Sequence, residues 1–256
     1  MTVFWCAGVY ASGSTWAYNI MRAVAAVGFP DRIRTSRFAE HQGDLVGIED
    51  TAALHVVKSH DLPADAAMLL LAQTPRVIIT VRDPRDAVTS LMQFQRYGFE
   101  RAGQTIAKSA RFALRLLEKQ PEALVLRFED QFTDNANTVL RIAEFLGVPL
   151  TPGAAAAIFA AHRREAVERF IAKMPDDAAA KHDPRSGDWY DPATQWHKHH
   201  AGRDGEIGRW QRLLLPGQPA AIETDCGPYM DRFAYKRAPL HLPGYRLNVG
   251  SFKLDI

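Results

Sequence analysis

The chain has 256 residues, which is long enough to bury a core without help from disulfides or a structural metal. Lysine and arginine total 31 against 29 aspartate and glutamate residues, and the resulting net charge of +2 excludes a general nucleic-acid or membrane-surface binder. Two cysteines, Cys6 and Cys226, do not make a disulfide or zinc framework. The apolar run at the N-terminus is too short for a signal peptide or membrane span, so we expect a soluble, cytoplasmic protein.

The first predicted elements are a short buried strand at residues 3–7, a loop and a helix at residues 15–27. The loop at residues 8–15 has the spacing of a phosphate-binding loop, in which backbone N–H groups and a helix start favour an anion. Ser14 stands where a nucleoside triphosphatase has its lysine, which argues against ATP or GTP hydrolysis. We therefore expect a phosphorylated ligand. A glycine-rich turn without a ligand is the alternative reading of the loop alone.

Further strands are predicted at residues 54–57, 77–81 and 123–126, with helices at 86–97, 104–119 and 135–146. This alternation predicts a single three-layer α/β/α domain over residues 1–256 with a central parallel sheet. Ligands of such sheets bind beyond the carboxyl ends of the strands. The polar residues that follow each strand should therefore face one crevice.

Residues 174–205 form a long polar segment that carries Trp189, Tyr190 and Trp196. Because loops of this length are usually functional, we predict a lid, whose aromatic residues either line an acceptor pocket or anchor the loop on the core. The run of histidine and lysine at residues 197–200 raises the question of a metal. Adjacent side chains rarely converge on one ion, and no cysteine or acidic residue completes a set in the sequence, so we expect no metal.

Four segments carry polar residues in a recognisable order: Ser12-Gly13-Ser14-Thr15-Trp16, Lys58-Ser59-His60, Arg82-Asp83-Pro84-Arg85-Asp86 with Ser90, and residues 203–210. These segments resemble, in order, the motifs of the sulfotransferase family that uses 3′-phosphoadenosine 5′-phosphosulfate (PAPS) as donor and releases adenosine 3′,5′-bisphosphate (PAP). The order and spacing agree from residue 3 to about residue 215. A fifth stretch, residues 126–149, is similar to the middle of the family's fold.

The resemblance implies a P-loop-like fold in which three of these segments bind the donor nucleotide. The first would hold the 5′-phosphate and place a tryptophan on the adenine. The third would grip the 3′-phosphate with an arginine and a serine, and the fourth would close over the same phosphate. The donor-binding residues implied in this way are Ser12, Gly13, Ser14, Thr15, Trp16, Arg82, Ser90, Arg203 and Gly205.

The resemblance also implies the chemistry. His60 would take the proton of a hydroxyl or amine acceptor, and Lys58 would neutralise charge on the sulfonate or the bridging oxygen. The two residues lie on the same face of a strand because they are two positions apart. We expect a small-molecule or glycan acceptor chosen by residues 34–50 and 174–200, while the acceptor itself and the oligomeric state are open.

Two residues depart from the family's pattern. Ala11 stands where the family usually has lysine or arginine, and Asp204 replaces a lysine in the last segment. Arg203 and Arg209 are the cations left to compensate. Two other functions therefore stay open: a kinase-like phosphotransferase that needs a nucleoside triphosphate and Mg²⁺, and a non-catalytic nucleotide-binding protein. Ser14 counts against the first, and retention of the lysine–histidine pair counts against the second.

Other charged residues have a simpler reading. Arg82 and Arg85 either bind a phosphate or pair with the neighbouring acids Asp83 and Asp86. The acids at positions 129 and 130 are expected to cap the following turn, and we assign them no catalytic role.

Overall fold

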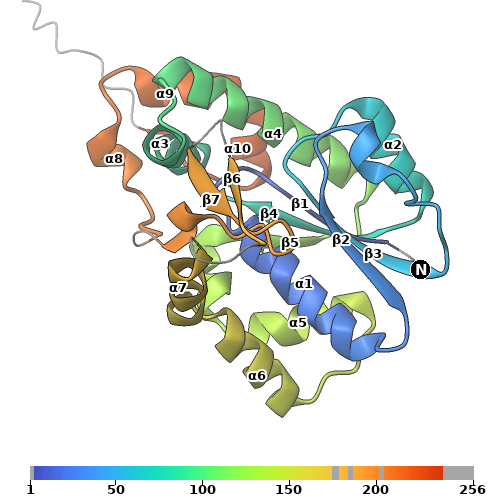
Figure 1. Ribbon diagram of the computed structural model, residues 1–256. Coiled ribbons are helices and arrows are strands. Elements are labelled where there is room, and N and C mark those ends of the chain that lie inside the picture. The colour runs from blue at the N-terminus through green and yellow to red at the C-terminus, as the bar shows by residue number, and fades with distance from the viewer. Residues whose placement is uncertain (1–2, 175–178, 184–186, 202–204, 239–256) are drawn as a thin grey trace, which may run out of the picture.

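The computed structural model describes residues 3–174, 179–183, 187–201 and 205–238. A parallel sheet with the strand order β2-β3-β1-β4-β5 lies at its centre, and helices cover both of its faces (Figure 1). The predicted three-layer α/β/α class is therefore confirmed. The strands of the sheet are β1 (Val3–Gly8), β2 (Ile33–Phe38), β3 (Ala53–Ser59), β4 (Arg76–Val81) and β5 (Leu124–Arg127).

Some of the helices begin or end at residues with recognisable capping chemistry. The Asp83 carboxylate accepts a hydrogen bond from the Arg85 amide at the start of α3, and Gly147, in the left-handed region, ends α5. No helix within the described residues is both long and apolar enough to cross a membrane. The helices are α1 (Ser14–Gly28), α2 (Ala64–Ala72), α3 (Pro84–Phe94), α4 (Phe99–Lys119), α5 (Asn137–Leu146), α6 (Pro152–His162), α7 (Arg164–Ala172), α8 (Trp210–Leu213), α9 (Gln218–Asp225) and α10 (Gly227–Arg232).

Strand β1 is buried along its whole length and divides the core into two layers. Its side chains alternate between the faces of the sheet, as the period of a strand requires. Phe4 and Cys6 pack with α1 and α5, whereas Trp5 packs on the other face, where its ring lies 6.1 Å from that of Phe112 in α4. A continuous apolar run in the sequence therefore becomes the central strand.

Two segments that the sequence assigns to loops contain strands. β2 overlaps the start of the segment at 34–50, which was expected to be a loop, and pairs with β3 at the edge of the sheet, where alternating polar residues are tolerated. Within the expected lid at 174–205, β6 (Lys181–Asp183) and β7 (Asp188–Tyr190) form an antiparallel hairpin. A 3-10 helix, η5 (Lys198–Ala201), follows it. Three-residue strands are too short to show a periodic pattern in the sequence.

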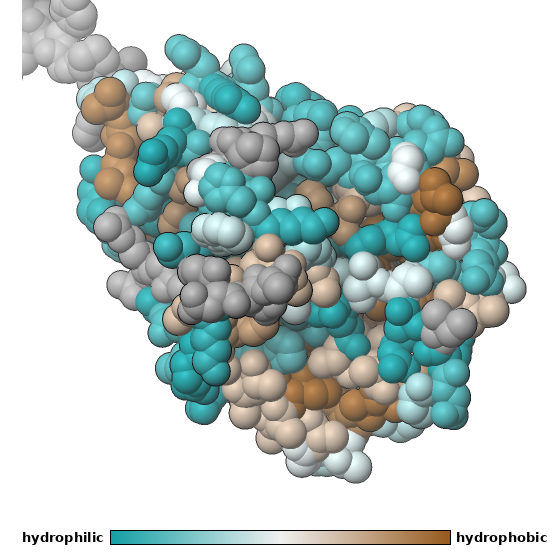
Figure 2. Space-filling view, viewed as in Figure 1, coloured by the Kyte–Doolittle hydropathy of each residue, from teal (hydrophilic) through white to brown (hydrophobic). Residues whose placement is uncertain are grey.

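The visible face of the molecule is mostly polar, with separate apolar patches rather than one continuous surface (Figure 2). Met68 on α2 and Leu213 and Leu215 at α8 are among the exposed large apolar side chains. Scattered apolar residues are normal on a monomer surface and call for no partner.

Candidate active site

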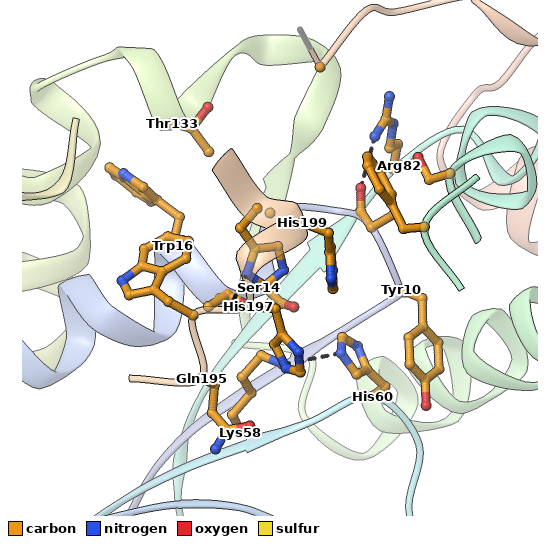
Figure 3. Close-up of a pocket in the computed structure, with 18 of the residues that line it drawn as sticks. Tyr10, Ser14, Trp16, Lys58, His60, Arg82, Thr133, Gln195, His197 and His199 are labelled. Atoms are coloured by element: carbon orange, nitrogen blue, oxygen red, sulfur yellow. Dashed lines mark hydrogen bonds between the residues drawn. The ribbon is translucent and has the colours of Figure 1, made fainter. Parts of the chain in front are cut away.

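A cavity of about 1290 Å³ lies beyond the carboxyl ends of β1, β3 and β4 (Figure 3). Its position agrees with the rule for ligand sites in open parallel sheets. Arg203, one of the residues implied to close over the nucleotide, and Asp204 lie outside the described residues. Ser12 is described but is not part of the lining. The other candidates all line the cavity: Gly13, Ser14, Thr15, Trp16, Lys58, His60, Arg82, Ser90 and Gly205.

The loop between β1 and α1 has the shape of an anion site. Gly13 precedes the helix with φ of 81°, and a Cβ there would lie only 2.9 Å from the Phe132 ring, so the position requires glycine. Helix α1 starts at Ser14, and its first N–H groups have no partner within the helix. The Ser12 hydroxyl is instead fully buried against the Val9 carbonyl (2.5 Å) and the Thr80 hydroxyl (2.6 Å). Ser12 shapes the loop and turns its hydroxyl away from the cavity.

Lys58 and His60 meet at the end of β3. Lys58 Nζ donates to His60 Nε2 over 3.1 Å, and His60 Nδ1 lies 2.9 Å from the Gly8 carbonyl oxygen. A carbonyl only accepts, so this contact assigns the proton of the neutral ring to Nδ1. Nε2 is then the atom with a free electron pair, and it faces the lysine.

Burial adjusts the charges of this pair. Burial lowers the pKa of Lys58, only 4% exposed, to about 8. Burial, and then the charge of Lys58, lower the pKa of His60 well below 6.5. At pH 7 the lysine is therefore mostly charged and the histidine is neutral.

Two aromatic side chains hold the His60 ring. Tyr10 stacks on it, with ring centroids 3.9 Å apart, and Phe38 meets it edge-on at 5.8 Å. Phe38 also lies 4.7 Å beneath the Lys58 ammonium group. Neither residue was predicted from the sequence. Tyr10 lies inside the loop motif at a position that the motif leaves unspecified, and Phe38 ends the unpredicted strand β2.

Arg82, at the end of β4, is 3% exposed and connects two distant parts of the chain. Its guanidinium donates to the Ala11 carbonyl (3.0 Å) and to the Glu206 carbonyl (3.1 Å), and it lies 4.1 Å from the Phe128 ring centroid. Its Nε atom is buried and has no hydrogen-bond partner among the described residues. A buried guanidinium with a spare donor at the edge of a cavity suits an anion.

A second guanidinium reaches the cavity from the C-terminal segment. Arg209, 6% exposed, donates through Nη2 to the Ser90 hydroxyl and through Nε to the Thr89 hydroxyl (3.1 Å). Both hydroxyls lie on α3, about two turns after the Asp83 cap. Arg209, one of the two cations expected to compensate for Asp204, therefore lies beside Ser90.

Arg85 has a structural role. Its guanidinium pairs with Asp83 (2.6 Å) and Glu223 (2.7 Å) and lies 3.9 Å from the Trp210 ring centroid. Asp86 accepts hydrogen bonds from the amides of Gly208 (2.6 Å) and Trp210 (3.0 Å). The pairing expected for Arg85 is thus present for Asp83, whereas Asp86 holds the C-terminal segment.

The expectation that Glu129 caps the following turn is wrong. Its carboxylate accepts from the Asp83 amide (2.7 Å) and the Tyr235 hydroxyl (3.0 Å), which joins β5 to the start of α3 and to the C-terminal segment.

The hairpin segment contributes histidines and aromatic residues to the cavity. Trp196 is 9% exposed, packs in the core layer under α1 and also lines the cavity. His197 and His199 line the cavity as well, and burial lowers the pKa of His197 to about 4. Asp188 lies beside them, within reach of a common ion. The premise that no acidic residue completes a metal-binding set does not hold once the chain is folded.

The sheet, the glycine turn at α1 and the two buried arginines define an α/β protein whose first loop has the geometry of a phosphate-binding loop. Within that class, the chain belongs to the sulfotransferase family. The family's sulfotransferase domain matches residues 2–234. No curated protein matches the chain.

Three solved structures have a fold similar to that of this chain. A mouse sulfotransferase, SULT7A1, complexed with PAP is 14% identical, with a TM-score of 0.61 over 90% of this chain and 85% of that one. Retinol dehydratase in complex with androsterone and inactive cofactor PAP is 16% identical, with a TM-score of 0.54 over 90% of this chain and 80% of that one. The same enzyme with retinol and PAP is 17% identical, with a TM-score of 0.55 and coverage of 90% and 81%. At these identities the likeness concerns the fold alone.

Proposed function

We propose that this protein transfers the sulfuryl group of PAPS to a hydroxyl or amine of a small-molecule acceptor. The observation that carries the proposal is the buried Lys58–His60 pair, which shares one cavity with the start of α1 and with Arg82. A base, a cation and two anion sites are the parts that such a transfer needs. The solved structures named above, which hold PAP, support the same donor class.

The cavity fits a nucleotide with phosphates at both ends. The first amides of α1 suit a 5′-phosphate, while Arg82, Arg209 and Ser90 suit a 3′-phosphate. We assign Arg203 to the second group by its place in the sequence motif. The volume of about 1290 Å³ exceeds the roughly 300–1,000 Å³ of ordinary ligand pockets, which leaves room for an acceptor beside the nucleotide.

Glycine and tryptophan would complete the nucleotide site. A Cβ at Gly205 would lie 2.6 Å from the Phe128 ring, the same ring that packs against the Arg82 guanidinium. The absence of a side chain at Gly205 therefore lets the C-terminal segment approach this ring. Trp16 is 5% exposed and packs in the core layer with α1, yet it also lines the cavity, with its indole N–H bound to the His162 carbonyl (3.1 Å), and we assign the adenine to its side of the cavity.

The donor supplies a sulfuryl group on a phosphate leaving group. His60 Nε2 takes the acceptor's proton as the new S–O or S–N bond forms and the bond to the bridging phosphate oxygen breaks. Lys58 stabilises charge on that oxygen. Bound sulfonate would offset the lysine charge that lowers the pKa of His60, which makes His60 a stronger base in the complex than in the free protein.

Lys58 acts without a second cation from the loop. Position 11 is alanine, and its carbonyl is already bound by Arg82. The acceptor side of the cavity is lined by aromatic residues, including Tyr10, Phe38 and Phe94, which favours an apolar alcohol, phenol or amine over a glycan. The described residues of the 174–205 segment also border this side, in keeping with a lid.

Titration calorimetry tests the donor class. PAP is expected to bind at least about tenfold more tightly than adenosine 5′-phosphate, and more tightly than ATP with Mg²⁺. Preference for ATP with Mg²⁺ would favour a phosphotransferase instead. Incubation with PAPS and a panel of phenols, alcohols, amines and sugars should then release PAP with at least one acceptor. Tight PAP binding without transfer to any acceptor would favour the non-catalytic protein.

A further inference from the structure

Three potential metal ligands converge over the acceptor side of the cavity. Asp188 comes from β7, and His197 and His199 come from the segment that follows it. One ligand atom from each lies within 4.8 Å of the other two. Figure 3 shows the two histidine rings close together at the cavity, on the side of the Lys58–His60 pair.

The backbone explains why residues so far apart in sequence meet. An isolated antiparallel bridge pairs Tyr190 with His197, which folds the chain back along β7. The His199 amide then donates to Asp188 Oδ2 (3.1 Å), which ties η5 to the same strand. The three side chains are therefore placed by a main-chain bridge and by a hydrogen bond from a main-chain amide to the Asp188 carboxylate, a rigid base for a site.

We propose that Asp188, His197 and His199 bind a divalent transition-metal ion such as Zn²⁺. Two imidazole nitrogens and one carboxylate are a ligand set that such ions accept, and a three-ligand site leaves a coordination position open. Mg²⁺ and Ca²⁺ prefer oxygen ligands and do not suit this set.

The hydrogen bonds of the three side chains fit this assignment. Nδ1 of His197 is buried without a hydrogen-bond partner among the described residues. Nδ1 of His199 lies 2.5 Å from Asp188 Oδ2, and the proton in that contact is the one that a metal ion would displace. Asp188 Oδ1 accepts from the Trp189 amide (2.9 Å), which fixes the carboxylate plane as an outer contact does in metal sites.

The surroundings carry charge of both signs. Asp183 lies opposite Asp188 in the hairpin register and adds negative charge, while Lys58 acts against a cation on the cavity side. The ion would join β7 to η5, and its open position would face the part of the cavity where an acceptor enters. It would therefore order the acceptor side without contact with the nucleotide site.

Metal titration of the tag-free protein tests the site without nucleotide, so the result is independent of the proposed transfer. One Zn²⁺ per chain is expected by calorimetry, and Co²⁺ should give the visible absorption of a nitrogen- and oxygen-bound ion, whereas Mg²⁺ should give no signal. Asp188→Asn and His197→Gln should each weaken Zn²⁺ binding at least about tenfold. His182→Gln, on the neighbouring strand of the hairpin but outside the ligand set, is the matched control.

Two results would overturn the proposal. One is an absence of stoichiometric Zn²⁺ binding. The other is binding that both ligand variants retain at the strength of the control, because that ion would be held elsewhere. Circular dichroism of each variant checks its fold. Because Asp188 and His197 lie on different segments of the chain, a folding defect in one variant leaves the other as the test. Anomalous scattering at the zinc edge from crystals of the complex would locate the ion directly.

Discussion

Lys58 and His60 share one buried hydrogen bond, in which the ammonium nitrogen lies 3.1 Å from Nε2 of the imidazole. Two groups that both become cations cannot be charged together at this distance without a large cost. The pair therefore holds one positive charge at neutral pH, on the lysine. An electron pair on Nε2 next to a cation is an arrangement suited to removing a proton while stabilising an anion.

Replacement of His60 should affect turnover rather than binding. His60→Ala is expected to lower kcat by at least about a hundredfold, because it removes the base, and to leave PAP affinity within about twofold. Steady-state kinetics and calorimetry measure the two quantities on one preparation. An unchanged kcat would exclude His60 as the base, and an equal loss in PAP affinity would point to a misfolded cavity.

The pH profile of kcat/KM should be bell-shaped, and its acid limb should lie below the range that is usual for a histidine base. The base must be neutral, so activity falls only as pH drops through the pKa of His60, well below 6.5. The lysine must be charged, so activity also falls as pH rises through about 8, the pKa of Lys58. Between these limits the rate should be flat.

Lys58→Arg separates the two limbs of that profile. Arginine stays protonated, so the alkaline limb should move upward by more than one pH unit while the acid limb persists. The maximal rate should fall because the guanidinium has a different shape. An alkaline limb that stays near pH 8 in the variant would assign it to a group other than Lys58.

Tyr10 should act through the orientation of the His60 ring. Tyr10→Leu removes the stacking partner at 3.9 Å and is expected to lower kcat by about tenfold, with a smaller change in the affinity for PAP. Tyr10→Phe keeps the ring and should keep most of the activity. Equal losses in the two variants would show that the hydroxyl, and not the ring, matters.

Much of the fold and the site could be predicted because the relevant signals are local. Buried parallel strands are continuous apolar runs, as in β1 and β4, and the residues that follow them must meet at one edge of the sheet. The Lys58–His60 pair and Arg82 were placed correctly in one cavity for this reason. The family resemblance supplied the roles, which geometry alone does not assign.

The missed features depend on contacts between distant segments. β2 carries arginine, threonine and serine at the sheet edge and so lacks an apolar signature. Because the strand was not predicted, the position of Phe38 beside His60 was not predicted either. The approach of Asp188 to the histidines depends on a fold-back after a three-residue strand. Ser12 matched the motif, yet its hydroxyl bonds to Thr80 on another strand, a contact that sequence spacing does not encode.

Arg85 should matter for stability more than for nucleotide binding. Arg85→Ala leaves the carboxylates of Asp83 and Glu223 buried without their partner, so the free energy of unfolding should drop by about 3–5 kcal/mol. Urea denaturation measures this loss. The control is Arg164→Ala, which removes an exposed pair with Glu168 and should cost about 0.5 kcal/mol or less. Similar losses in both variants would contradict the buried role of Arg85.

Arg82 should discriminate nucleotides by their 3′ group. Arg82→Ala removes a buried cation with a spare donor and should weaken PAP binding by about 2 kcal/mol, roughly thirtyfold, with much less effect on adenosine 5′-phosphate. Because Arg82 also joins the Ala11 and Glu206 carbonyls, Arg82→Lys provides a variant that keeps the charge and should lose less. Arg127→Ala, at the end of the next strand and bound to the Phe233 carbonyl, is the matched control and should bind both nucleotides normally. Equal losses for the two nucleotides in Arg82→Ala would mean that Arg82 supports the loop and does not read the 3′-phosphate.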